Sequence, residues 1–335
     1  MQTDQTRNPR GSLRVILITQ GISPILEPFL QSQHSVVGIV ESALRSYRKV
    51  PLLYRFRGFL NGVLSAILSQ PKDLRSFART HEIPYFFLSK DNNSDFGDWL
   101  RRKAPHVVVV YRMSQLLTED ILDIPEHGCI NLHPAYLPKY RGPVPGFWQY
   151  YDMDLCPGIT VHHIDPGEDT GDIIFQEKVE IPLGSDHQEL RRKLVNRTGP
   201  ELLLEAVRML ARGNCPAQPQ PAESPTRRAR LFDLSEVKHL IDWDVWPVER
   251  VWHFLKGDFY ARKALLASNP VPGIIYTLES YRKTSDNTRP GRIERKNNQY
   301  ILGTKDGEII LSRHFSIGNF LITMAKKVIL VLRWC

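Results

Sequence analysis

Leu13–Thr19 reads LRVILIT, a short run rich in β-branched residues that is typical of a strand buried on both faces of a sheet. Three similar runs follow it along the chain: Ser35–Val40, Ile83–Leu88 and His106–Tyr111. Helical patterns lie between them, as in Asp73–Thr80 and Phe96–Lys103. This alternation predicts an α/β fold with a Rossmann-like parallel sheet and helices on both faces.

The pattern continues with further strands and a long helical stretch. The turn after the first strand, TQGISP, lacks the GxGxxG spacing of a dinucleotide-binding loop, so no dinucleotide is expected there. Expected strands follow at Cys129–His133, Gly158–Ile164 and Ile173–Ile181. Apolar residues at helical spacing then mark Asp186–Arg212 as helical.

A proline-rich segment predicts a domain boundary. Pro216–Arg230 has no apolar period and is expected to be a linker. Residues 1–215 then form a larger N-terminal domain, and residues 231–335 a smaller C-terminal domain. Beyond the linker, Leu231–Leu255 is expected to be helical in parts. Short strands with Asn, Asp and Gly turns make the rest of this domain β-rich and OB-like: Gly273–Thr277, Gly291–Arg295, Tyr300–Gly303 and Glu308–Arg313.

The composition is that of an ordinary globular protein: 335 residues, 42% hydrophobic and 24% charged. A formal net charge of +8 favours anionic partners such as nucleic acid, a nucleotide or a membrane surface, without choosing among them. Four cysteines without a CxxC pair predict a reducing, cytoplasmic location. No uninterrupted apolar run reaches the ~18 residues that a spanning helix needs.

Two segments concentrate the residues that can carry chemistry: NLHPAYLPKYRG at Asn131–Gly142 and HHIDPGEDTGD at His162–Asp172. Asn131 and His133 are two apart on an expected strand, so their side chains share one face. The carboxyl end of a parallel strand is where open α/β sheets bind ligands. An amide can hold an oxygen that gains charge, an imidazole can move a proton, and a carboxylate can orient that imidazole. Since neither segment contains Ser or Cys, direct acyl transfer is favoured over a covalent enzyme intermediate.

These joined motifs resemble the formyltransferases that use 10-formyltetrahydrofolate. That family joins Asn-x-His to a Leu-Pro pair and to a later Asp-x-Gly, and the spacing of the His and the Asp is also similar. The matching residues here are Asn131, His133, Leu137, Pro138, Asp169 and Gly171. The region after the linker resembles, more loosely, the C-terminal domain of the methionyl-tRNA and sugar formyltransferase branch.

The resemblance implies 10-formyltetrahydrofolate as the donor and a primary amine as the acceptor. Asn131 would hold the formyl oxygen, His133 would act as general base or acid, and Asp169 would orient His133. The residues implied for folate binding are Tyr111, Arg112, Met113, Leu137, Asp165 and Gly167. Tyr140 and Arg141 are expected to contact the substrate. No metal is expected.

The identity of the amine stays open between two branches of the family. The first turn and the basic segment after the second strand depart from the tRNA branch, whereas Val110–Met113 and YRGPVPGFW are closer to the branch that formylates amino sugars. A nucleotide-linked amino sugar is therefore favoured, with Arg112 and Arg141 gripping its diphosphate. Methionyl-tRNA is the alternative, its phosphates contacted by Arg45, Arg48, Lys49, Arg55 and Arg57.

Other interpretations are less favoured. Val50–Leu68 and the tail Lys326–Trp334 mix apolar and basic residues, which allows peripheral membrane contact and a lipid-linked amine, although core elements are the more common outcome. A formyl-folate hydrolase and a catalytically inactive binding homologue remain open.

His162 and His163 are expected to be structural, because neighbours on a strand point in opposite directions and so do not suit zinc. A homodimer is expected by analogy only.

Overall fold

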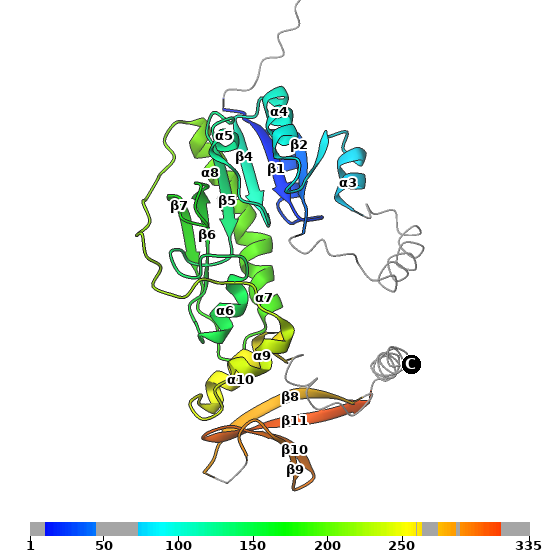
Figure 1. Cartoon of the computed structure of the whole chain (residues 1–335), viewed down its shortest axis with the longest axis vertical. Coiled ribbons are helices and arrows are strands. Elements are labelled where there is room, and N and C mark those ends of the chain that lie inside the picture. The colour runs from blue at the N-terminus through cyan, green and yellow to red at the C-terminus, as the bar shows by residue number, and fades with distance from the viewer. Residues whose placement is uncertain (1–10, 45–72, 259, 263–273, 286–288, 316–335) are drawn as a thin grey trace, which may run out of the picture. The chain divides into compact units, whose positions relative to one another are not determined.

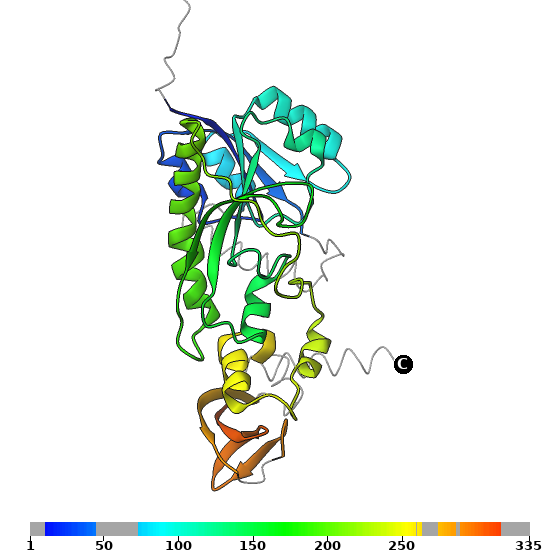
Figure 2. The same cartoon turned by 90° about the vertical axis from the view of Figure 1, so that its left-hand side faces the viewer.

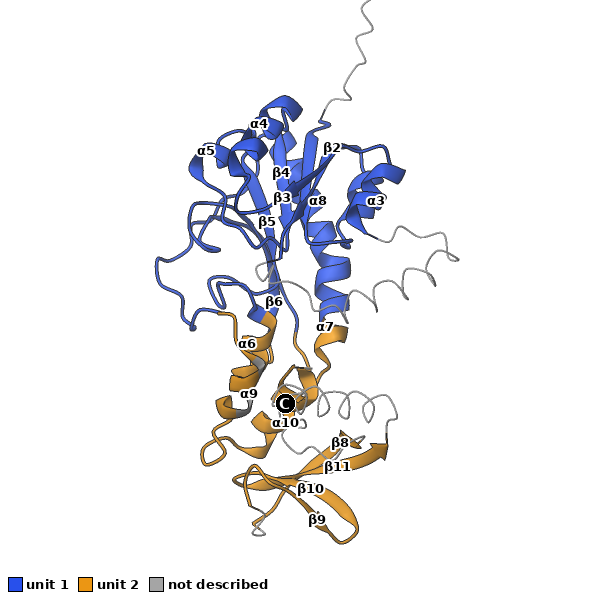
Figure 3. Ribbon diagram, turned by 45° about the vertical axis from the view of Figure 1, so that its right-hand side comes forward, with its two compact units in different colours: residues 1–145, 157–179, 191–229 blue, residues 146–156, 180–190, 230–335 orange. Residues whose placement is uncertain are grey.

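The computed structural model describes residues 11–44, 73–258, 260–262, 274–285 and 289–315. The chain divides into two compact units (Figure 3). Unit 1 comprises Met1–Pro145, Pro157–Val179 and Arg191–Ala229, and unit 2 comprises Gly146–Cys156, Glu180–Leu190 and Arg230–Cys335. The expected membrane-contacting segments, 50–68 and 326–334, and the five basic residues assigned to tRNA phosphates lie outside the described residues.

Unit 1 is built on a seven-stranded sheet with the order β3-β2-β1-β4-β5-β6-β7 (Figure 1). Its strands are β1 (Arg14–Thr19), β2 (Ser35–Ser42), β3 (Tyr85–Leu88), β4 (Val107–Tyr111), β5 (Cys129–His133), β6 (Gly158–His163) and β7 (Ile173–Lys178). β1 to β5 run parallel, which confirms the predicted sheet, whereas β6 runs antiparallel to both of its neighbours, β5 and β7. Residues 164–172 are too few for a parallel crossover between β6 and β7.

Helices cover both faces of this sheet. They are α1 (Leu26–Leu30), α3 (Leu74–Thr80), α4 (Asn93–Lys103), α5 (Glu119–Leu122) and α8 (Gly199–Ala211), the last continuing from α7 (His187–Lys193) through the π-helical turn η1 (Leu194–Thr198). α8 contacts α1, β6 and β7. In Figure 2 the blue α1 and the green α8 lie on one face, and the cyan α4 lies on the other. This arrangement leaves the carboxyl ends of the parallel strands available for a site.

The centre of the sheet explains its stability. Every residue of β4, whose sequence is VVVVY, is buried. Burial of each valine contributes about 1.5–3 kcal/mol, and β-branched side chains suit a strand packed on both faces.

Local signals also act at helix ends: Asp73 caps α3 by accepting a hydrogen bond from the Ser76 amide at 2.7 Å. Among the described residues, no helix combines the length and apolar character needed to cross a bilayer.

Unit 2 contains a four-stranded antiparallel sheet with the order β8-β11-β10-β9. Its elements are α6 (Pro145–Tyr151), α9 (Leu234–Leu240), α10 (Val248–Gly257), β8 (Ile274–Lys283), β9 (Ile293–Lys296), β10 (Gln299–Gly303) and β11 (Gly307–Phe315). α10 contacts β8 and β11. The predicted β-rich character is confirmed, and β8 extends six residues beyond the expected end at Thr277 because it pairs along the whole of β11.

A buried histidine lies in the core of unit 2. His253 on α10 is fully buried, and its ring stacks on Tyr150 with centroids 4.7 Å apart. Its Nδ1 accepts a hydrogen bond from the Gly184 amide at 3.0 Å, which places any proton of the neutral ring on Nε2. Within the described part of the chain, Nε2 has no hydrogen-bond partner. Burial lowers the pKa of His253 to about 4.

The proline-rich segment is attached to unit 1 along most of its length. Gln218 forms a β-bridge with Ile173, and the Ala229 amide donates to the carbonyl of Arg141 at 2.7 Å. The hydroxyl of Ser224 donates to the carbonyl of Pro138 at 2.8 Å. We call residues 218–229 the strap, because their hydrogen bonds tie together loops that follow β5 and β6.

Candidate functional site

β5 brings two polar side chains to the carboxyl end of the parallel part of the sheet. Asn131 and His133 lie on one face of this strand, as their spacing predicted, and Pro134 follows directly. β5 lies between β4 and β6, so both side chains are flanked by neighbouring strands. His133 is only 4% exposed. A titratable ring in such a position needs specific polar partners.

The loop between β6 and β7 supplies the carboxylate. Asp169 has a φ of 57°, in the left-handed region, and the loop around it is held by the hydroxyl of Thr170, which donates to both carboxylate oxygens of Asp165 at 2.7 and 2.8 Å. A Cβ on Gly171 would lie 2.0 Å from the carbonyl oxygen of His163, and one on Gly167 would lie 1.9 Å from the Thr170 hydroxyl. The two glycines therefore allow the tight path that aims Asp169 at β5.

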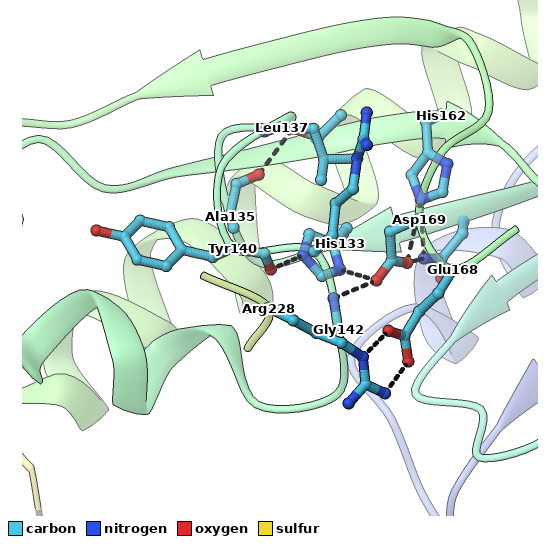
Figure 4. Close-up of polar contacts among 12 residues, drawn as sticks. His133, Ala135, Leu137, Tyr140, Gly142, His162, Glu168, Asp169 and Arg228 are labelled. Carbon is cyan, nitrogen blue, oxygen red and sulfur yellow. Dashed lines mark hydrogen bonds and ion pairs between the residues drawn. The ribbon is translucent and has the colours of Figure 1, made fainter. Parts of the chain in front are cut away.

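Asn131, His133 and Asp169 converge, as Figure 4 shows for the last two. The Oδ2 atom of Asp169 lies 3.5 Å from Nδ1 of His133 and accepts a hydrogen bond from the Gly142 amide at 2.9 Å. Its Oδ1 atom accepts from Nδ2 of Asn131 at 3.4 Å. Two of the side chains that the sequence singled out, Asn131 and His133, therefore contact the carboxylate of the third, Asp169.

The surroundings of His133 define its tautomer. Its Nε2 lies 3.0 Å from the carbonyl oxygen of Tyr140, and a carbonyl only accepts, so this nitrogen carries a proton. In the neutral ring Nδ1 is then unprotonated and faces Asp169. When Nδ1 takes up a proton, the carboxylate beside it stabilises the resulting imidazolium. His133 can therefore accept a proton through Nδ1.

A second imidazole completes the cluster. His162 is 2% exposed and pairs with Asn131 across the antiparallel β5–β6 ladder. Its Nδ1 donates to the carbonyl of His163 at 2.6 Å, which leaves Nε2 to accept from Nδ2 of Asn131 at 3.1 Å. Nε2 also lies 3.6 Å from Oδ1 of Asp169. His162 was expected to be structural, because the sequence does not show that the β5–β6 register places it opposite Asn131.

Burial and neighbouring groups have opposite effects on the pKa values of His133 and Asp169. Burial lowers the pKa of the His133 imidazole, against the opposite effect of the Asp169 carboxylate. Burial alone would raise the pKa of the Asp169 carboxyl, but His133, His162 and the Gly142 amide together hold it well below its usual range. Near neutral pH the site thus presents a neutral imidazole beside a charged carboxylate.

The residues predicted to contact substrate lie next to this pair but face elsewhere. Tyr140 contributes its backbone carbonyl to His133, while its ring points away in Figure 4. Arg141 is 8% exposed, and its guanidinium donates to Gln220 and to the carbonyls of Pro221 and Ala222. These bonds occupy most of its donors, and a substrate role for Arg141 stays a prediction.

The residues implied for folate binding occupy two neighbouring places. Tyr111 is buried at the end of β4, and Arg112 follows it, exposed and with a φ of 64°. Met113 packs against the apolar core beneath β4. Leu137 is buried, and its amide donates to the Thr160 hydroxyl at 3.1 Å. Asp165 and Gly167 belong to the Asp169 loop. Because β4 and β5 are adjacent, the Tyr111–Met113 group follows a strand that lies beside β5.

Sequence reasoning missed the contribution of the strap. The side chain of Gln220 donates to the backbone carbonyls of Asp169 and Gly171, and the hydroxyl of Thr226 accepts from the Tyr140 amide at 2.7 Å. A proline-rich composition gave no indication of these contacts. Among the described residues, no group of three or more His, Cys, Asp or Glu side chains is arranged to hold a metal.

Comparisons with known proteins agree with the family resemblance seen in the sequence motifs. The family model described as Formyl transferase matches residues 63–207. The methionyl-tRNA formyltransferase of Geobacter sulfurreducens is 31% identical over 249 residues, which cover 72% of this chain and 74% of that protein. That of Carboxydothermus hydrogenoformans is 32% identical over 269 residues, covering 80% of this chain and 79% of that protein.

A solved structure shares the fold. WlaRD, a sugar 3N-formyl transferase crystallised in the presence of dTDP and 5-N-formyl-THF, superposes with a TM-score of 0.57. The superposition covers 91% of this chain and 99% of that chain, at 15% sequence identity. At this identity the likeness concerns the arrangement of the backbone.

Proposed function

This chain belongs to the formyltransferase family, and we propose that it transfers the formyl group of 10-formyltetrahydrofolate to a primary amine, with methionyl-tRNA as the acceptor. One observation carries the chemistry: the carboxylate of Asp169 contacts both the imidazole of His133 and the carboxamide of Asn131. An amide donor, a proton acceptor and an anion that stabilises the protonated acceptor are the groups that acyl transfer to an amine requires.

Asn131 is the proposed partner of the formyl oxygen. One hydrogen of its Nδ2 is engaged by His162 at 3.1 Å, whereas its contact with Asp169 is 3.4 Å long and therefore weak. The second hydrogen can turn to an incoming carbonyl oxygen that becomes negatively charged as the amine attacks. Loss of one such donor typically lowers the rate about 100- to 1000-fold.

His133 and Asp169 are the proposed proton-transfer pair. As the bond from the amine nitrogen to the formyl carbon forms, Nδ1 of His133 accepts the proton that the amine loses. When the bond from the formyl carbon to the folate nitrogen breaks, the same atom returns the proton to that leaving nitrogen. Burial lowers the pKa of His133, which keeps the ring neutral and able to accept before attack.

The donor pocket is proposed at the two groups beside the triad. Tyr111, Arg112 and Met113 continue from β4 and can offer backbone groups to the pterin, with Leu137 and the loop from Asp165 to Gly167 completing the pocket. The supporting observation is the β4–β5 register, which pairs Val110, the residue before Tyr111, with Asn131. The folate supplies the formyl carbon, and the chain supplies binding and proton transfer.

Methionyl-tRNA is preferred to an amino sugar for two reasons. The relatives at 31 and 32% identity are methionyl-tRNA formyltransferases. Arg141, one of the two arginines assigned to a sugar-linked diphosphate, is instead buried under the strap. A nucleotide-linked amino sugar is therefore the competing acceptor in the test below. Membrane contact, a homodimer and a cytoplasmic location stay predictions.

An acceptor screen with 10-formyltetrahydrofolate tests this proposal. We expect initiator methionyl-tRNA to gain the mass of one formyl group, and nucleotide-linked amino sugars to remain unmodified. Asn131→Ala is the matched control and should lower the rate about 100- to 1000-fold. Formylation of a sugar alone would move the acceptor assignment to the other branch, and no gain with any amine would overturn the proposed transfer.

A further inference from the structure

Two contacts of the catalytic pair come from one short stretch of backbone, Tyr140 to Gly142. The carbonyl of Tyr140 accepts from Nε2 of His133 at 3.0 Å, and the amide of Gly142 donates to Oδ2 of Asp169 at 2.9 Å. Tyr140 has a φ of 56° and Gly142 a φ of 122°, both in the left-handed region. A tyrosine persists in that region only where its surroundings hold it.

The strap supplies part of what holds this stretch. The Thr226 hydroxyl accepts from the Tyr140 amide at 2.7 Å. The Ala229 amide donates to the Arg141 carbonyl at 2.7 Å, and the Ala229 carbonyl accepts from the Val144 amide at 3.0 Å. A Cβ on Gly142 would lie 3.0 Å from the Ala229 carbonyl oxygen, so the strap fits closely against this backbone. The conformation that aims the Tyr140 carbonyl at His133 therefore depends on residues more than 80 positions later.

The side chain of Gln220 connects this stretch to the loop that carries Asp169. Its Oε1 accepts from Nε and Nη2 of Arg141 at 3.2 and 2.9 Å. Its Nε2 donates to the carbonyls of Asp169 and Gly171 at 3.1 and 2.7 Å. Arg141 is 8% exposed, so its guanidinium needs these acceptors. Only a neutral amide side chain can accept from a cation on one side and donate to two carbonyls on the other.

We propose that Gln220 and Arg141 are positioning residues that fix the proton of His133 on Nε2 and set the distance from its Nδ1 to Asp169. For catalysis this inference rests on the proposed formyl transfer, since neither residue touches the catalytic side chains directly. Gln220 fixes the backbone of Asp169, and Arg141 fixes the backbone between Tyr140 and Gly142. Two side chains of the strap, Gln220 and Thr226, thereby act on the proposed catalytic pair through backbone groups.

Gln220→Glu and Gln220→Ala test the two halves of the bridge. The isosteric Glu keeps an acceptor for Arg141 but loses the donor to Asp169 and Gly171, whereas Ala loses both. We expect each variant to lower kcat about 10- to 100-fold, the range typical of misplaced catalytic groups, with a smaller change in KM. The acidic limb of the pH–rate profile should also move. Glu223→Gln, on the exposed part of the same strap, is the matched control and should behave as the unaltered enzyme.

A second measurement separates this inference from the proposed function. NMR of ring-labelled histidine reports the tautomer and titration of His133 without any substrate. We expect the unaltered chain to show the Nε2-protonated ring, and Gln220→Glu to show a mixture of tautomers and a displaced titration. If the chain transfers no formyl group, this result still decides the positioning role.

Thr226→Val keeps the inference testable if the Gln220 variants do not fold. This nearly isosteric change removes the acceptor of the Tyr140 amide and should shift the same His133 signals. Unchanged kcat, pH profile and His133 tautomer in folded variants would overturn the inference. Equal losses in Glu223→Gln would also overturn it, because they would assign the effect to the strap's general stability.

Discussion

Two buried histidines, one in each unit, have opposite surroundings. His133 in unit 1 faces a carboxylate with one nitrogen and a carbonyl with the other. His253 in unit 2 stacks on Tyr150, and its Nε2 is unpaired within the described residues. Burial lowers the pKa of both rings. Burial therefore makes either ring neutral, but only the ring beside Asp169 can carry a positive charge briefly, as proton transfer requires.

Asp169→Asn should leave His133, like His253, without a carboxylate beside its ring. Of the proposed variants, it should lower kcat the most. The amide keeps a similar shape and can still accept from the Gly142 amide, but it no longer stabilises an imidazolium. We expect kcat to fall by about 10⁴-fold, the loss seen when the carboxylate behind a catalytic imidazole is replaced by its amide. Steady-state kinetics with saturating donor measure this loss.

The control for Asp169→Asn is thermal unfolding. The variant should unfold in one cooperative transition, which would show that it is still folded. If the variant turns over at close to the normal rate, the charge of Asp169 has no part in the reaction. The difference drawn between the two histidines would then lose its functional meaning.

His253 should contribute to the acid sensitivity of unit 2. Its folded pKa of about 4 lies below the ordinary value of 6.5, so the unfolded chain binds more protons between these pH values. The free energy of unfolding therefore falls as the pH drops from 6.5 to 4, by on the order of 3 kcal/mol for this ring. Above pH 6.5 the ring makes no pH-dependent contribution. Denaturant unfolding at pH 7 and pH 4.5 measures the change.

His253→Phe is the matched variant for that measurement. Phe keeps an aromatic ring against Tyr150 but cannot titrate, so the slope between pH 6.5 and 4 should become shallower. It also removes the acceptor of the Gly184 amide, which should lower stability at pH 7 by about 1–3 kcal/mol. Identical slopes in the two proteins would contradict the assignment of acid sensitivity to His253.

Glu168→Gln should have the smallest effect, although Glu168 is next to Asp169 in sequence. Glu168 pairs with Arg228, whose side chain is 55% exposed (Figure 4). Exposed ion pairs contribute about 0.2–1 kcal/mol, so both the melting temperature and kcat should change little. Arg228→Gln is the control and should give a similar result. A loss comparable to that of Asp169→Asn would show that a carboxylate can act on His133 without contacting it.

The strands of unit 1 could be predicted because their information is local. The β-branched run at Val107–Tyr111 and the fixed period of two at Asn131 and His133 identify strand and facing directly from the sequence. The antiparallel direction of β6 was not predicted. The linker interpretation was incomplete, because prolines describe local backbone preference and carry no information about hydrogen-bond partners elsewhere.

The candidate site was predictable where its members are joined by motifs, and less so where they meet only in three dimensions. Asn131, His133 and Asp169 were found from motif spacing, and the structure brings them together. His162 was missed because its partner is set by the β5–β6 register, and Gln220 because its partners lie about 50 to 80 residues earlier. For Arg141 the sequence shows the charge but not the acceptors that surround its guanidinium.

The strap also has a consequence for biosynthesis. A nascent chain can form all seven strands of the sheet once Lys178 has left the ribosome, yet the backbone around Tyr140 lacks Thr226 and Ala229 until about 50 more residues have emerged. Chains that stop at Cys215 therefore contain the proposed catalytic side chains without the segment proposed to align them. Alignment of the proposed active site is thereby linked to the emergence of Thr226 and Ala229.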